Sequence, residues 1–149
     1  MNKKLLKNQK GLTLIELLAV IVILAIVAAI AVPAIGNIIE NSRYNAVKSD
    51  AINVLNAAHL YYTDNPGGDP KVIGTATQVT IKQLKEANYL ETAGKIPDEA
   101  LVFNNNPKQL TTNPITYSGN KQVTFTKASI TVINADPNKG SGAGGYVIQ

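Results

Sequence analysis

Glu16 lies at the start of a long apolar run, and its position raises the clearest chemical question in this chain. The run from Leu17 to Ile35 is nineteen residues without a charge, whereas a carboxylate in hydrocarbon costs roughly 2.5–3.5 kcal/mol. Because such a cost is tolerated where the acid has a partner, Glu16 predicts ion pairing inside an apolar environment. A second interpretation remains open, since Thr13 and Glu16 have the spacing of a capping box at a helix N-terminus.

No other residues have the spacing of a catalytic or metal-binding set. His59 is the only histidine and has no Asp or Cys at ligand spacing, so we expect a surface or partly packed side chain. Tyr61 and Tyr62 are expected to pack in the core and at its rim. The sequence contains no nucleophile–base–acid set and no phosphate-binding glycine loop, which predicts a protein that is not an enzyme and needs no cofactor or metal. Four acids in turn contexts fit no EF-hand loop and are expected to be solvated turn caps: Asp64, Asp69, Asp98 and Asp136.

The charge of the chain is concentrated at its beginning. The formal net charge is +4, and four lysines precede Gly11, so the ten remaining Lys and Arg residues balance the ten Asp and Glu residues. This distribution follows the positive-inside rule and predicts a cytoplasmic N-terminus. It leaves little electrostatic case for nucleic-acid binding by the rest of the chain. Cysteine is absent, so packing and not disulfides must hold the fold.

The apolar run is long enough to cross a bilayer as a helix. A secretory signal peptide is the alternative, and the letters AAIAVPA offer an imperfect cleavage-like site. Signal peptides, however, have an apolar region of only about 7–15 residues. The length therefore favours a retained transmembrane helix.

Helical periodicity continues beyond the apolar run. Apolar residues recur on one face as far as Tyr62, which predicts one helix over residues 12–62, weakened around Pro33 and Gly36. The turn-forming letters TDNPGGDP then end it. The positions expected on this face are Ile35, Ile39, Val47, Ala51, Val54, Leu55, Ala58 and Tyr62.

The second half of the chain predicts a short helix followed by strands. The helix is expected to begin near Thr80, which has capping-box spacing with Gln83. The segments ITYSG, QVTFTK and SITVIN read as strands of one small antiparallel sheet, and YVIQ as a possible edge strand. A sheet this small needs its apolar face covered, and the amphipathic half of the long helix is the best candidate. The expected fold is α+β, with a leader at residues 1–11, an apolar helix at 12–39 and a globular head at 40–149.

The letters KGLTLIELLAVIVILAIVAAIAVPAI closely resemble the N-terminal signature of type IV pilins and pseudopilins. That family has a short basic leader ending in glycine, then an apolar helix with glutamate at the fifth mature position and often proline at the twenty-second. Counted from Leu12, Glu16 and Pro33 occupy those positions. The resemblance is strong over about forty residues and looser in the segments beyond.

The resemblance implies a processing site and an assembly site. A prepilin peptidase would cut between Gly11 and Leu12 and methylate the new amine of Leu12. Glu16, with Thr13 beside it, would then pair with the N-terminal amine of a neighbouring subunit in a filament core. The segment around Pro33 and Gly36 would lose helicity in the filament; a simple kink at Pro33 is the alternative.

Two features depart from the common pattern of the family. Its usual first mature residue is phenylalanine, where this chain has Leu12. Many Gram-negative members close their C-terminal region with a disulfide, whereas this head would have to secure that region by strand pairing. Both features are similar to members from Gram-positive bacteria.

The function that the resemblance implies is that of a structural subunit of a type IV pilus. Its partners would be copies of itself, the prepilin peptidase, an assembly platform protein and a motor ATPase. It would wait in the cell membrane with its N-terminus in the cytoplasm and end in a surface filament. The alternatives are a pseudopilin of a competence or type II secretion system, and a monomeric membrane-anchored binding module. DNA capture is a further possibility, for which Lys121, Lys127 and Lys139 are the candidate residues.

Overall fold

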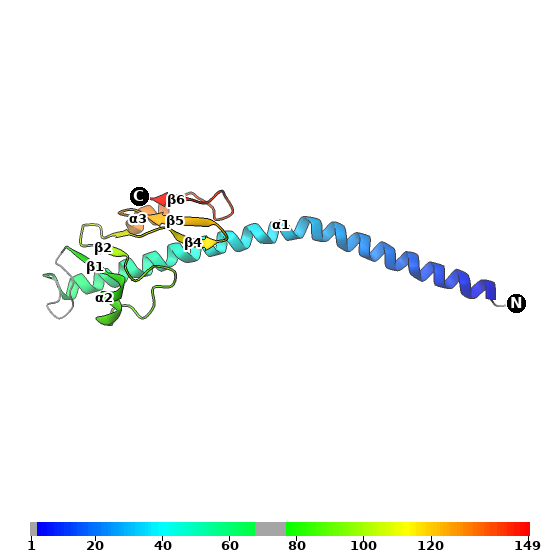
Figure 1. Ribbon diagram of the computed structural model, residues 1–149, viewed down its shortest axis with the longest axis horizontal. Helices are drawn as coiled ribbons and strands as arrows, with labels where there is room; N and C mark the ends of the chain where they lie inside the picture. Colours follow the sequence, from blue (N-terminus) through cyan, green and yellow to red (C-terminus); the bar gives the residue numbers. More distant parts are fainter. Residues whose placement is uncertain (1–2, 68–76) are drawn as a thin grey trace. The chain divides into compact units, whose positions relative to one another are not determined.

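The computed structural model describes residues 3–67 and 77–149, with side chains described from Thr13 onward (Figure 1). The chain divides into two units, Met1–Ile38 and Ile39–Gln149. The elements in chain order are α1 (Lys3–Asp64), β1 (Gln78–Thr80), α2 (Ile81–Glu86), β2 (Leu101–Phe103), β3 (Gln109–Thr111), β4 (Ile115–Ser118), β5 (Lys121–Phe125), α3 (Ile130–Ala135) and β6 (Tyr146–Ile148). This is the α+β, pilin-like fold expected from the sequence.

The helix α1 is longer than predicted at its start. It begins at Lys3, ends at Asp64 and remains helical through Pro33 and Gly36. Local loss of helix around Pro33 concerns an assembled state and stays a prediction. The predicted helix end at Tyr62 is close to the observed end at Asp64. Asn65 lies just beyond the helix and donates its backbone N–H to the Tyr61 carbonyl at 2.9 Å.

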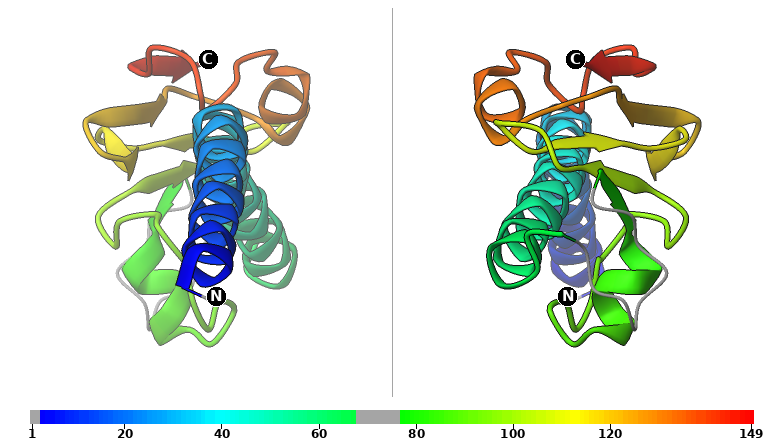
Figure 2. Two further views of the ribbon diagram at one scale, coloured as in Figure 1. Left: turned by 90° about the vertical axis from the view of Figure 1, so that its right-hand side faces the viewer. Right: turned by 90° about the vertical axis from the view of Figure 1, so that its left-hand side faces the viewer.

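Residues 39–64 of α1 pack into the core of the second unit. The strands of both sheets lie beside this half of the helix (Figure 1, Figure 2). The predicted face is confirmed from Val47 onward, whereas Ile35 and Ile39 are exposed. The buried face also includes Tyr44 and Tyr61, and its members are Tyr44, Val47, Ala51, Val54, Leu55, Ala57, Ala58, Tyr61 and Tyr62.

The strands form two sheets, so the expectation of one sheet is wrong. β1, β2 and β3 make an antiparallel sheet in that order, and β4, β5 and β6 make a mixed sheet in which β6 runs parallel to β5. An isolated bridge pairs Leu110 of β3 with Ala128, three residues after the end of β5, with backbone N···O distances of 2.9 and 3.0 Å. The strands of the first sheet have three residues each, too few to give a clear alternation in sequence.

Of the two short helices, α2 agrees with the sequence prediction and α3 does not. The capping box at Thr80 is confirmed. The Thr80 hydroxyl accepts from the Gln83 backbone N–H, and the Gln83 side-chain oxygen accepts from the Thr80 backbone N–H. The strand predicted at SITVIN is wrong, because this segment forms α3. Ser129 caps α3 by accepting from the Val132 N–H at 3.4 Å, and Ile133 turns into the core. The β-branched composition of the segment pointed to a strand, but the cap and the single buried position decide the helix.

Candidate functional site

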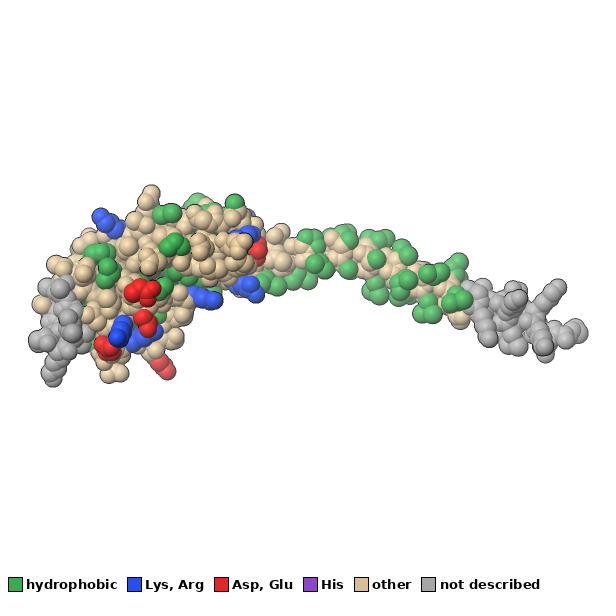
Figure 3. All heavy atoms as spheres, viewed as in Figure 1, with side chains coloured by type: hydrophobic (Ala, Val, Ile, Leu, Met, Phe, Trp, Pro, Cys, Tyr) green, Lys and Arg blue, Asp and Glu red, His purple; other side chains and the backbone are tan. Residues whose placement is uncertain are grey.

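The first unit carries a continuous apolar surface along α1. The side chains from Thr13 to Ile30 are all exposed, and hydrophobic side chains dominate this part of α1 in Figure 3. By length and composition, α1 contains a helix that could cross a membrane. An apolar surface of this extent is unstable in water and needs lipid or protein to cover it. The large exposed side chains are Leu14, Ile15, Leu17, Leu18, Val20, Ile21, Val22, Ile23, Leu24, Ile26, Val27, Ile30, Val32, Ile35 and Ile38.

Glu16 is the only charged residue between Thr13 and Ile39. Its side chain is exposed, and within the described residues it has no hydrogen-bond or ion-pair partner. The capping interpretation does not hold for the uncut chain, because α1 begins at Lys3 and Thr13 therefore lies inside the helix. Removing the residues before Leu12 would place Thr13 and Glu16 in the first turn, where a carboxylate favours the helix dipole.

The other residues singled out in the sequence also lie on α1. Gly11 and Leu12 lie within this helix, and the Leu12 side chain is outside the described part of the chain. Pro33 is inside the helix, and a Cβ added at Gly36 would meet nothing within 4 Å. The structure thus brings these residues onto one helix, in the order in which the sequence has them.

Polar contacts, which we call the polar clamp, hold the C-terminal segment of the second unit against α1. Glu40 pairs with Lys121 at 2.6 Å, and the Asn41 side chain accepts from the Ser141 N–H at 2.9 Å. Gly140 lies so close to α1 that an added Cβ would collide with the Glu40 carbonyl. Strand pairing of β6 with β5 adds to these contacts. The segment is therefore secured by strand pairing, as expected, and also by the Glu40 and Asn41 side chains of α1.

Asp136 is the centre of the clamp, and its expected role as a solvated turn cap is wrong. Its carboxylate accepts from the Tyr44 hydroxyl at 2.6 Å and from Lys48 Nζ at 3.1 Å, and only 5% of the side chain is exposed. Burial raises the pKa of Tyr44, which keeps its hydroxyl a donor. Burial also acts to raise the pKa of Asp136, but the bonds from Tyr44 and Lys48 outweigh it and leave that pKa below its ordinary value. Tyr44, Lys48 and Glu40 are one or two helical turns apart, a spacing that could have revealed this face.

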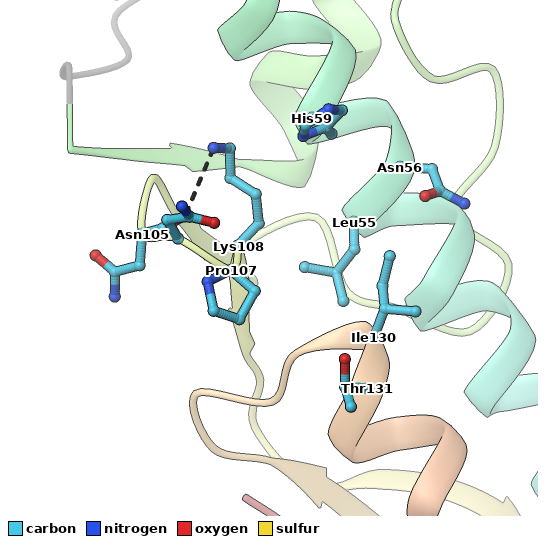
Figure 4. A pocket seen from close by; sticks show the side chains of 9 residues that line it. Leu55, Asn56, His59, Asn105, Pro107, Lys108, Ile130 and Thr131 are labelled. Atoms are coloured by element: carbon cyan, nitrogen blue, oxygen red, sulfur yellow. Dashed lines mark hydrogen bonds between the residues drawn. The ribbon is translucent and has the colours of Figure 1, made fainter.

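Polar and apolar residues together line one cavity of the second unit. His59 is exposed at the rim of a cavity of ≈ 340 Å³ between α1, the loop before β3 and the start of α3 (Figure 4). Leu55 and Ile130 form its apolar wall, and Lys108 Nζ approaches the Asn105 carbonyl at 3.5 Å. Among the described residues, no group of His, Cys, Asp and Glu could hold a metal ion.

The lysines considered for DNA capture do not form one free cluster. Lys121 pairs with Glu40, and only about a quarter of each side chain is exposed. Lys127 and Lys139 are exposed. Without Lys121, the candidate set loses a third of its charge, and no argument for DNA binding remains beyond the one made from the sequence.

Comparison with known protein families matched the prokaryotic N-terminal methylation motif to residues 6–32 of this chain. No curated protein matched the chain, and no solved structure did. The matched residues include Gly11, Leu12 and Glu16 and most of the exposed apolar surface. The N-terminal segment is a type IV pilin-like prepilin signal.

Proposed function

We propose that this protein is a prepilin that is cut by a prepilin peptidase and polymerises through α1 into a type IV pilus filament. The observation that carries the proposal is the exposed apolar surface of residues 14–38, in which Glu16 is the only charged residue and which lies largely within a methylation motif. Such a surface needs either lipid or other copies of itself throughout the life of the protein. A filament core supplies the second of these.

Cleavage between Gly11 and Leu12 gives Glu16 its partner. Hydrolysis of this peptide bond removes the four leader lysines and creates an α-ammonium group on Leu12. Methylation of this amine preserves its positive charge. Because α1 continues through both residues in the uncut chain, the peptidase must open the helix there, and glycine lowers the cost of doing so.

Pairing between copies then fixes how the helices align. The α-ammonium of one copy neutralises Glu16 of its neighbour, so neither charge stays alone among apolar side chains. A buried polar pair of this kind sets register at some cost in stability, as a single polar residue does in a coiled coil. Apolar contacts alone would allow the helices to slide.

The cell membrane holds the subunits before assembly. The leader lysines keep the N-terminus in the cytoplasm while α1 spans the bilayer. An assembly platform protein and a motor ATPase would extract each subunit. Extraction exchanges lipid contact for helix contact, so the apolar surface stays out of water.

The test is the variant Glu16→Ala in the full chain. The expected result is a subunit of processed size in the membrane and at least a tenfold loss of sheared surface filaments, measured by immunoblot and electron microscopy. Val20→Ala, one turn further along the same exposed surface, is the matched control and should assemble. Glu16→Gln separates charge from size and should fail as Glu16→Ala does.

Two results would contradict this proposal. Wild-type protein that never enters filaments would support a monomeric anchored module. Filaments formed normally by Glu16→Ala would remove the proposed role of this acid.

A further inference from the structure

A cationic hollow lies on the second unit beside the early part of its α1 segment. We call it the Arg43 groove: it has a volume of ≈ 430 Å³ and is lined by Arg43, Ala46, Val47, Lys95 and Tyr117. Val47 and Tyr117 are buried and form its floor, while Arg43 and Lys95 are exposed at its edges. No acid is among the lining residues.

The two cations of the Arg43 groove are unpaired within the described part of the chain. The ion pairs of this unit use other residues: Lys48 with Asp136, Lys82 with Glu86, Lys85 with Asp98 and Lys121 with Glu40. The Asp50 carboxylate accepts from the Lys95 backbone N–H at 2.9 Å, so it fixes the loop and leaves the ammonium free. An arginine and a lysine beside an aromatic floor suit a carboxylate ligand.

Two exposed carboxylates, Glu86 and Glu91, lie further along the same unit. The Tyr89 hydroxyl donates to Asp64 at 2.9 Å, which places the turn after α2 beside the last residue of α1. Glu86 and Glu91 flank Tyr89 in sequence and are exposed, and Glu91 has no partner within the described residues. In the face shown in Figure 3, acidic side chains and lysines lie together in the region of α2, where Lys82 pairs with Glu86 and Lys85 with Asp98.

The groove and the acids are separated along the helix. Lys95 lies at the level of Asp50, and the turn after α2 lies at the level of Asp64. Fourteen residues of α-helix correspond to about 21 Å. The Arg43 groove therefore lies toward the start of this helix segment, and the turn that carries Glu86 and Glu91 lies further toward its end.

We infer that the Arg43 groove receives Glu86 and Glu91 of a second copy of this chain, in an end-to-end contact between heads. This inference rests on the proposed function, in which the N-terminal helices of all copies point the same way. Heads shifted along parallel helices would bring the Arg43 groove of one copy toward the part of its neighbour where Glu86 and Glu91 are exposed. The near-neutral charge of the chain beyond its leader argues for this partner over a polyanion.

The experiment is a charge swap in the full-length protein, measured as the yield of sheared filaments. Arg43→Glu/Lys95→Glu should lower the yield at least tenfold while the processed subunit remains in the membrane. Glu86→Lys/Glu91→Lys should do the same. All four substitutions in one chain restore opposite charges between neighbours and should recover the yield to within about threefold of wild type.

Lys127→Glu/Lys139→Glu is the matched control. It changes the net charge by the same amount, uses two exposed lysines that do not line the groove, and should leave the yield near wild type. If the reversed groove depletes the membrane pool, Arg43→Gln/Lys95→Gln replaces it, with the same loss of filaments expected.

The inference is overturned if wild-type filaments form and either pair of substitutions behaves like the control. It is also overturned if the fourfold variant assembles no better than the groove variant. Failure of the proposed function looks different, because wild-type protein would then give no filaments at all.

Discussion

Asp136 shows how one side chain organises the C-terminal part of the head. Its carboxylate joins Tyr44 and Lys48 of α1 to the segment after α3, and Asn138 Nδ2 donates to it at 2.6 Å. Tyr44 also packs against Tyr117 and Tyr146, with ring centroids 5.1 and 5.6 Å away. The charge and the aromatic cluster therefore stabilise the same junction.

Acid should weaken this junction. The pKa of Asp136 is lower in the fold than its ordinary 3.8, so its contribution is present above that value and is lost as the pH falls through the folded pKa. Asp136→Asn should lower the free energy of unfolding at pH 7 by about 1–3 kcal/mol and flatten its pH dependence below pH 4. Thermal unfolding of the full-length protein in detergent, followed by tyrosine circular dichroism, measures both.

Asp98→Asn is the control for this prediction. Asp98 pairs with Lys85 at the surface, where 56% of its side chain is exposed, so its removal should change stability by less than about 1 kcal/mol. Equal effects of the two variants would contradict the role given to Asp136.

The chemically distinctive residues of the N-terminal segment are easier to recognise in the sequence than those of the head. Glu16 is conspicuous because all its neighbours are apolar, and its meaning depends on spacing within one helix. Asp136 looked like an ordinary turn residue because its partners Tyr44 and Lys48 are 92 and 88 residues away. A single sequence carries no signal for such a contact.

Among the secondary elements, the close approach of the 136–142 segment to α1 depends on Gly140. A side chain at this position would collide with the Glu40 carbonyl and the Tyr44 Cβ. Gly140→Ala should therefore lower the free energy of unfolding by about 1–3 kcal/mol, measured by the same thermal unfolding. Gly67→Ala, where an added Cβ meets nothing within 4 Å, is the control and should be close to neutral.

The segment around Pro33 offers a second test at this scale. Pro33→Ala/Gly36→Ala replaces two poor helix formers on α1 and should make local loss of helix in the filament harder. The expected result is filaments that assemble normally and extend less under force, measured with an optical trap. Wild-type extension in the double variant would favour a simple kink at Pro33.

Strand-like composition correctly predicted β4, β5 and β6 but failed at α3, whereas the helix with several agreeing signals was predicted. The helix over residues 81–86 combines a capping box with an apolar stripe, and both are present. The segment 129–134 offered β-branched composition alone, and tertiary packing of Ile133 together with the Ser129 cap made it a helix. Two sheets instead of one followed from three-residue strands, whose pairing is set by distant chain segments.

In the whole molecule, one unit exposes its apolar side chains to water and the other buries them. Residues 14–38 expose apolar side chains that water does not tolerate, whereas the second unit buries its own core and is stable by packing, strand pairing and the clamp. The proposed polymer would resolve this difference, because its core would cover the apolar helices and its surface would present the heads. In this account, cutting the chain before Leu12 starts the change from membrane protein to polymer.

The most direct measurement is the mass of the N-terminal peptide of the native protein recovered from sheared surface filaments. We expect a chain that begins at Leu12 with a methylated α-amine, in thin filaments visible by electron microscopy. Native protein that still begins at Met1, found only in the membrane fraction, would contradict it.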